Sequence, residues 1–233
     1  MRNEWPCLHG LAGEQIARMS EKQAKRRAGR PTADEAEYKR RTLIVTALEE
    51  FAKAGFHSAS LTDIAQKTEI SSRTLYNYYA DKLALFEACL EYSGSQIQPD
   101  PPEVNGDLHA RLVDYATKMQ RQLFTPLSMQ IARLIYRDAS DFAELRKIAR
   151  VQFERHQVMP VAKMLDAQGM PSGASEILAR QFVAMALGEW QRRLLFGGDR
   201  MTPKEMASHA NFVTTLFLKG SDSCLAAYCN SCE

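Results

Sequence analysis

The stretch "SLTDIAQKTEISSRTLYNYY", residues 60–79, decides the fold of the N-terminal part of this chain. Ser60 is followed three positions later by an aspartate, a capping-box-like pair that marks the start of a helix. The helical pattern then breaks, and Ser71 or its neighbour begins a second helix. The spacing predicts two short helices, over about 60–68 and 71–79, joined by a turn of two or three residues. This arrangement is a helix-turn-helix unit.

The second of these helices has few ordinary apolar residues. Leu75 and Tyr79 are four positions apart and can hold it against a core. A helix that enters the major groove of DNA must present hydroxyls, amides and cations to bases and phosphates. The remaining positions supply these groups: Ser72, Arg73, Thr74, Tyr76, Asn77 and Tyr78.

Helical periodicity begins near residue 34 and continues almost to the end of the chain, and no segment shows a sustained two-residue alternation. We therefore expect an all-α protein. Pro160 should kink or split one long helix, and Gly220 should end the last one. Besides the two short helices, the pattern predicts helices over about 33–54, 80–94, 107–123, from Pro126 onward, 141–168, within 172–198, and from Thr202 to Gly220.

Prolines and glycines interrupt the helical pattern between residues 93 and 107, in "SGSQIQPDPPEVNGD". This segment is either a linker between two domains or a long loop within one. We place the boundary here, which gives the N-terminal three-helix helix-turn-helix domain and a larger C-terminal helical domain. The predicted divisions are a disordered basic arm at 1–32, the helix-turn-helix domain at 33–95, the C-terminal domain at 107–220 and a disordered tail at 221–233.

The composition is that of an ordinary globular chain, with 233 residues, 45% hydrophobic and 25% charged. No signal peptide or membrane span is evident, so we expect a cytoplasmic protein. Five scattered cysteines do not predict a disulfide framework. The net charge of +2 conceals a basic cluster ahead of Pro31, which is either a solvated terminus or a polyanion-binding arm. Its members are Arg18, Lys22, Lys25, Arg26, Arg27 and Arg30.

Residues 43–90, "LIVTALEEFAKAGFHSASLTDIAQKTEISSRTLYNYYADKLALFEACL", resemble the DNA-binding domain of the tetracycline-repressor (TetR/AcrR) family of bacterial regulators. The resemblance covers about residues 36–92. It is carried by Phe51-Ala52-Gly55-Phe56, by Asp63-Ile64-Ala65, and by Thr74-Leu75-Tyr76 followed by Tyr79 and Lys82.

The resemblance implies particular roles in DNA binding. Thr74, Tyr76 and Tyr78 would touch phosphates or groove edges, and Lys82 would clamp a backbone phosphate. Arg73 either reads guanine, which would contribute about 1–3 kcal/mol of discrimination, or binds phosphate. The full predicted set is Arg27, Arg30, Ser60, Thr62, Ser71, Ser72, Arg73, Thr74, Tyr76, Asn77, Tyr78 and Lys82.

The basic arm would extend this interface, because arginines before the first helix can enter an adjacent minor groove. Residues 1–18 match nothing in the family, whereas Met19 begins a stretch typical of a family start. We therefore expect translation to begin at Met19.

Two positions depart from the family pattern. Glu69 stands in the turn where glycine is common, and a left-handed residue other than glycine costs about 1–2 kcal/mol. Either the turn is altered or some stability is lost. Tyr78 replaces a frequent histidine.

The resemblance also implies that the last two long helices pair with their copies in a second chain. The segment "ARQFVAMALGEWQRRLLFG" is similar to the AefR-like subset of these regulators. The helices from about residue 107 to residue 168 would enclose an effector cavity, although methionines and aromatics at helical spacing also serve as plain core. The proposed lining residues are Met119, Phe124, Tyr136, Phe153 and Trp190, with His109 and His156 as possible polar anchors.

These features predict a homodimeric transcriptional regulator, a repressor that leaves a palindromic operator when a small molecule binds. An activator is an alternative, as is a redox- or metal-responsive regulator that uses Cys224, Cys229 and Cys232, spaced C-x4-C-x2-C. Neither a nucleophile elbow nor a P-loop nor a glycine fingerprint is present, so we expect no catalytic residues and no cofactor or metal.

Overall fold

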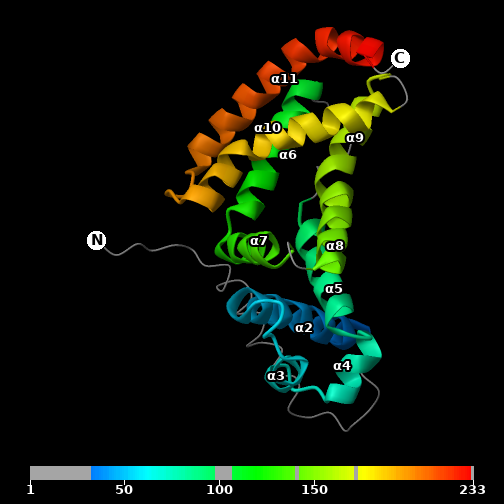
Figure 1. Cartoon of the computed structure of the whole chain (residues 1–233), viewed down its shortest axis with the longest axis vertical. Helices are drawn as coiled ribbons and strands as arrows, with labels where there is room; N and C mark the ends of the chain where they lie inside the picture. The colour runs from blue at the N-terminus through cyan, green and yellow to red at the C-terminus, as the bar shows by residue number, and fades with distance from the viewer. Residues whose placement is uncertain (1–32, 98–106, 140–141, 171–172, 232–233) are drawn as a thin grey trace. The chain divides into compact units, whose positions relative to one another are not determined.

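The computed structural model describes residues 33–97, 107–139, 142–170 and 173–231, with side-chain detail up to residue 220 (Figure 1). These residues are helical with short connections, and no strand occurs among them, which confirms the all-α prediction. The helices are α2 (Ala33–Ala54), α3 (Leu61–Lys67), α4 (Ser72–Tyr78), α5 (Lys82–Ser95), α6 (Leu108–Leu123), α7 (Pro126–Asp138), α8 (Ala143–Phe153), the π-helical η1 (Glu154–Val158), α9 (Met159–Asp166), α10 (Ala174–Phe196) and α11 (Pro203–Ser231).

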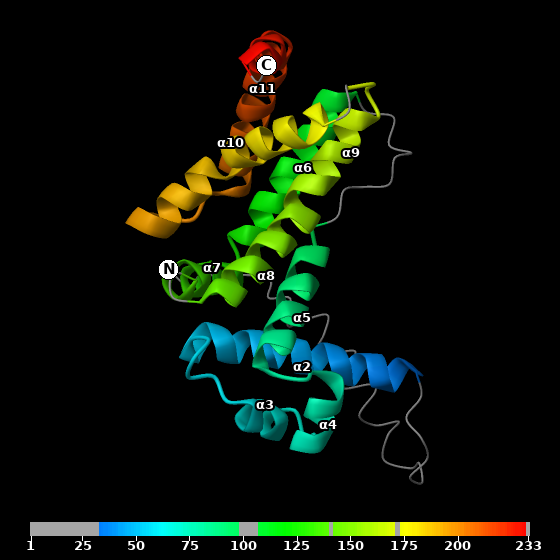
Figure 2. The ribbon, with the colours of Figure 1, turned by 45° about the vertical axis from the view of Figure 1, so that its right-hand side comes forward.

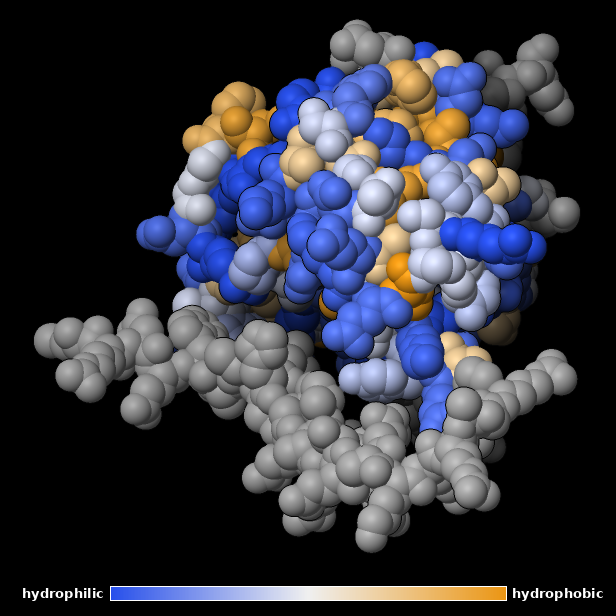
Figure 3. Space-filling view, turned by 90° about the horizontal axis from the view of Figure 1, so that it is seen from below, coloured by the Kyte–Doolittle hydropathy of each residue, from blue (hydrophilic) through white to orange (hydrophobic). Residues whose placement is uncertain are grey.

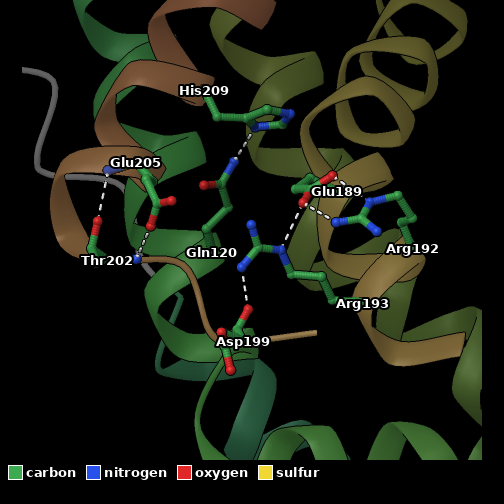
Figure 4. A network of polar contacts seen from close by, with 8 residues as sticks. All are labelled: Gln120, Glu189, Arg192, Arg193, Asp199, Thr202, Glu205 and His209. Atoms are coloured by element: carbon green, nitrogen blue, oxygen red, sulfur yellow. Dashed lines mark hydrogen bonds and ion pairs between the residues drawn. The ribbon is translucent and has the colours of Figure 1, made fainter. Parts of the chain in front are cut away.

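The predicted helix starts are confirmed by their capping hydrogen bonds. Ser60 Oγ accepts from the Asp63 amide at 3.2 Å, and Ser71 Oγ accepts from the Thr74 amide at 3.1 Å. At the start of α11, Thr202 and Glu205 form the reciprocal capping box: each accepts from the backbone N–H of the other (Figure 4). Local sequence therefore fixes where these helices begin.

The turn between α3 and α4 is built as a Schellman motif. The Ile70 amide donates to Ala65 O at 3.0 Å, and the Glu69 amide donates to Gln66 O at 3.2 Å. This pattern requires a left-handed residue at position 69, and Glu69 adopts φ 54°. The turn therefore has the usual Schellman geometry, and Glu69 adopts a backbone conformation that is strained for a residue other than glycine.

One hydrophobic core joins the helix-turn-helix to helices beyond the proline-rich segment. Phe51, Ile64, Leu75 and Phe86 are all fully buried in it. The same cluster contains Ile131 and Leu134 from α7 and Leu145 from α8, and α5 packs beside α8 (Figure 2). Hydrophobic residues from both sides of segment 98–106, where the sequence suggested a domain boundary, therefore pack into the same core.

A second core lies among α6, α9, α10 and α11. Its largest buried side chains include Tyr115 and Phe182. The Phe182 ring packs edge-on against the Phe217 ring, with 5.2 Å between the ring centres. Helix α10 buries residues on several sides, as its sequence predicts.

Next to this core, Glu189 accepts hydrogen bonds from Arg192 and Arg193 near the end of α10 (Figure 4). These bonds lower the pKa of Glu189 to about 2.

The expected break at Pro160 takes the form of a π-helical turn. Helix α8 widens into η1 and continues as α9, where Pro160 lies in the first turn. Proline lacks the N–H that would bond to the carbonyl four residues back. The Tyr115 hydroxyl donates to that carbonyl, His156 O, at 2.7 Å. The side chain from α6 thus satisfies the acceptor that Pro160 leaves open.

The predicted stop at Gly220 is wrong, because α11 continues to Ser231. A glycine inside a helix costs only about 1 kcal/mol relative to alanine, and no proline follows it. Helix formers at 225–227 favour continuation. The boundary predicted at residues 220 and 221 therefore falls within this helix, whereas the predicted basic arm at 1–32 lies outside the described residues.

Candidate nucleic-acid interface and internal cavity

Helix α4 has one buried face and one exposed polar face. Leu75 is completely buried and Tyr79 is 7% exposed, as the sequence predicts, so these two side chains fix the helix on its core. Tyr76 and Tyr78 are about half exposed, at 53% and 51%. Ser72, Arg73 and Asn77 are also exposed. The structure therefore brings the predicted base- and phosphate-contacting groups of α4 together on one accessible surface.

The predicted hydroxyl residues flank this surface. Ser71 and Thr74 hold each other through their hydroxyls at 2.8 Å, and Ser71 also caps α4. Thr62 is exposed on α3, whereas Ser60 is half-buried as its cap. The end of the molecule that carries α3 and α4 is mainly hydrophilic where its described residues are visible (Figure 3). Such a surface suits a phosphate backbone better than an apolar partner.

Lys82 has internal contacts that the sequence did not suggest. Its ammonium donates to His57 O at 2.7 Å and to Ala59 O at 3.1 Å, and it lies 5.3 Å from the centre of the Phe56 ring. Partial burial lowers the pKa of Lys82. An ammonium has three N–H donors, so one remains for the predicted phosphate. Lys82 thus braces the loop after α2.

Residues 43–89 match the model of the family described as "Bacterial regulatory proteins, tetR family". The N-terminal part of the chain is therefore similar to the DNA-binding domain of this family. The match spans α3 and α4, the two helices of the helix-turn-helix, together with most of α2 and α5.

Two curated proteins that match most of the chain are named as regulators. The chain is 24% identical over 164 residues to the HTH-type transcriptional repressor SCO4008 of Streptomyces coelicolor, covering 65% of this chain and 80% of the relative. It is 23% identical to the uncharacterized HTH-type transcriptional regulator YvkB of Bacillus subtilis, covering 76% and 94%. A crystal structure of a TetR-family regulator from Mesorhizobium loti has the same fold, with a TM-score of 0.64, 23% identity and coverage of 81% and 98%.

The described helices line a cavity of about 310 Å³, hereafter the cavity. Its walls come from α5, α7, α8, η1 and α10, with Leu123 at the end of α6. Three of the five predicted ligand residues line it: Tyr136, Phe153 and Trp190. Met119 and Phe124 are buried in the second core instead and do not line it.

The polar residues of the cavity were mostly missed by sequence reasoning. Gln152 Oε1 and Gln157 Oε1 are buried and accept no hydrogen bond from the protein. His156, which the sequence did suggest, lies 3.1 Å from Glu91 Oε2 through its Nε2, close enough for an ion pair but not aligned as a hydrogen bond. His156 and Gln157 lie in the π-helical turn ahead of Pro160, whereas Gln152 lies in the last turn of α8.

Asp138 at the end of α7 is a second residue that sequence reasoning missed. Its carboxylate is 8% exposed, accepts from the Phe56 amide at 3.1 Å, and pairs with Arg137 at 2.5 Å. The Arg137 hydrogen bond, assisted by the Phe56 amide, holds the pKa of Asp138 below its usual value. The contact ties α7 to the loop between α2 and α3.

Neither a metal site nor a membrane span is found in the described part of the chain. None of its clusters of histidine, cysteine, aspartate and glutamate could hold a metal ion. None of the described helices is both long and apolar enough to cross a bilayer. The side chains of Cys224, Cys229 and Cys232, and those of Arg27 and Arg30, lie outside the described side chains.

Proposed function

We propose that this chain is a homodimeric transcriptional repressor that inserts α4 into the major groove of a palindromic operator and leaves it when a small molecule fills the cavity. The observation that carries the proposal is the division of α4 into a face buried through Leu75 and Tyr79 and a face that exposes Ser72, Arg73 and Asn77. The matches to the TetR-family model and to a named repressor support it.

The exposed residues of α4 divide into two roles. Tyr76 and Tyr78 offer hydroxyls that suit phosphates along the groove walls. Arg73 lies near the start of the helix, where recognition helices reach base edges, and its guanidinium suits guanine O6 and N7. Arg27 and Arg30 would add contacts from the arm.

Apolar residues on α10 and α11 support dimerisation through these helices. Phe212 and Leu216 lie one turn apart on α11 and are 65% and 53% exposed, and Phe196 at the end of α10 is 81% exposed. Ala184 and Gly188 form a small-residue stripe on the exposed side of α10, where another helix could approach closely. A second copy of the chain would cover these surfaces. The similarity of this segment to the AefR-like subset is part of the same proposal.

Two elements connect the cavity to the DNA-binding domain. Helix α5 begins directly after α4 and supplies Leu90 and Gly94 to the cavity wall. Helix α7 supplies Ile135 to the cavity and Asp138 to the loop before α3. A ligand that favours a different packing of these helices would change the spacing of two α4 helices in a dimer. A few kcal/mol of differential binding is sufficient.

The proposal is tested by selecting bound sequences from random duplexes with the full chain at fixed salt, and repeating the selection with Arg73→Ala. We expect a palindromic consensus, with preference relaxed at one symmetric position in the variant and a loss there of about 1–3 kcal/mol.

Arg133→Ala is the matched control, because Arg133 is exposed on α7, away from α4. It should keep the full preference. A uniform loss of affinity with Arg73→Ala would make Arg73 a phosphate contact, and the absence of any preferred sequence for the wild type would refute the proposed function.

Dimerisation is tested by Phe212→Asp combined with Leu216→Asp. Two charges placed in a buried apolar interface should shift the chain from dimer to monomer at micromolar concentration. Sedimentation equilibrium measures the mass. The control is Lys204→Asp, an exposed site in the first turn of the same helix. A wild type that sediments as a monomer would contradict the dimer.

A further inference from the structure

The chemistry of the cavity narrows what it can hold. Its lining is mainly apolar, with aromatic rings from Tyr136, Phe153 and Trp190. The Trp190 ring is fixed by its Nε1 hydrogen bond to Leu123 O at 3.0 Å, and Gln191 donates to the Tyr136 hydroxyl at 3.2 Å. Both contacts hold ring surfaces in place before any ligand arrives. A ligand with flat apolar faces would pack against such walls.

The charge of the cavity argues against a cationic occupant. None of the described residues that line it is acidic, whereas Arg150 contributes a cation. The nearest carboxylate, that of Glu91, is engaged by Arg155 at 2.7 Å and lies 3.1 Å from His156. A buried cation would therefore have no opposite charge beside it, which is unfavourable.

Two buried amide oxygens indicate which polar group a ligand of the cavity should carry. Gln152 is 6% exposed, lines the cavity, and its Oε1 accepts no hydrogen bond from the protein. Gln157 Oε1, five residues further along the chain, is also buried and accepts no hydrogen bond from the protein. A buried acceptor without a donor destabilises the folded protein, so a ligand that brings a donor gains affinity at this position. A carboxylate brings no donor, whereas a hydroxyl does.

We propose that the cavity binds an uncharged aromatic molecule of two or three rings whose hydroxyl group donates to Gln152 Oε1, with its rings between Phe153 and Trp190. A volume of about 310 Å³ is at the lower end of ligand pockets and fits a compact molecule of this kind. This inference rests on the proposed function only in taking the cavity as the effector site. It adds the ligand class and the residue that selects it.

The test compares ligands that differ at the hydroxyl alone. Calorimetry with the full chain, without DNA and at neutral pH, measures binding of 4-phenylphenol, 4-methoxybiphenyl and biphenyl-4-carboxylate. We expect 4-phenylphenol to bind about tenfold more tightly than its methyl ether, since the ether cannot donate a hydrogen bond. Equal affinities for the phenol and its ether, or tighter binding of the carboxylate, would overturn the proposal.

The variant Gln152→Met keeps the length of the side chain and removes its amide. It should abolish the tenfold preference by weakening binding of the phenol while leaving that of the ether unchanged. Gln181→Met is the control, because Gln181 is exposed on α10, and it should retain the preference. If Gln152→Met does not fold, Gln152→Asn withdraws the oxygen by one methylene and carries the same expectation. A preference that survives loss of the Gln152 oxygen would also overturn the proposal.

Adding the operator separates this inference from the proposed function. A phenol that binds with the expected preference but leaves the protein on its operator supports the inference and contradicts the effector role. A chain that binds its operator yet shows no preference for the phenol overturns the inference and leaves DNA binding intact.

Discussion

The backbone of Glu69 shows how one residue in the recognition unit departs from its easiest conformation. Its φ of 54° places it in the left-handed region, where glycine is favoured. The conformation is imposed by the two hydrogen bonds that end α3, from the Glu69 and Ile70 amides. The side chain is exposed and gives no compensating burial. The strain therefore remains in the folded state.

Replacing this residue should stabilise the protein. Glu69→Gly removes about 1–2 kcal/mol of strain, offset by about 0.4–1 kcal/mol from the more flexible unfolded chain, for a net gain of about 0.5–1 kcal/mol. Urea unfolding followed by circular dichroism measures it. Glu69→Ala is the matched control, because alanine keeps the strain and should change stability by less than about 0.5 kcal/mol. Equal gains in both variants would show that the backbone angle is not the cause.

At the scale of elements, the sequence predicts most of the helices and fewer of the irregularities. Helices α3, α4, α7 and α11 begin where a capping serine or threonine stands, because the cap is a local hydrogen bond. The end of α11 could not be found in this way. A glycine permits a helix to stop but does not force it to, and the balance depends on the residues that follow.

The π turn η1 is the element that sequence analysis could least anticipate. Pro160 predicts a disturbance, but the form it takes depends on Tyr115, which reaches from α6 to the freed carbonyl of His156. The close approach of α5 also contributes, because a Cβ on Gly94 would lie 2.5 Å from the His156 ring. These are tertiary contacts between segments far apart in sequence. For the same reason the sequence predicted Met119 and Phe124 as effector-site residues from their residue type, whereas they lie in the second core.

At the scale of the whole molecule, α7 is shared between the cavity and the DNA-binding domain. Ile135 and Tyr136 line the cavity, and Asp138 accepts from the Phe56 amide in the loop before α3. Ile131 and Leu134 belong to the same core as the helix-turn-helix. If ligand binding shifted α7, the contacts that hold α3 and α4 on their core would therefore change.

The strength of this connection is predicted to depend on pH. The folded pKa of Asp138 is lowered from its model-compound value of 3.8, so its contribution is fully present above about pH 4 and is lost as the pH falls through the folded pKa. At pH 7, Asp138→Asn should reduce the free energy of unfolding by about 1–3 kcal/mol, since a buried charge-assisted bond is lost. Urea unfolding at several pH values measures the difference between wild type and variant, which should shrink as the pH falls through the folded pKa.

The control is Asp114→Asn, because Asp114 pairs with Lys118 at 2.8 Å on α6 and both side chains are partly exposed. Such pairs contribute less than about 1 kcal/mol, so its effect should be small at every pH. A constant difference between wild type and Asp138→Asn from pH 7 to pH 2 would mean that packing, and not the ionised carboxylate, holds α7 to the loop before α3. A difference that collapses in acid would instead show that the ionised Asp138 carboxylate holds α7 to the loop before α3.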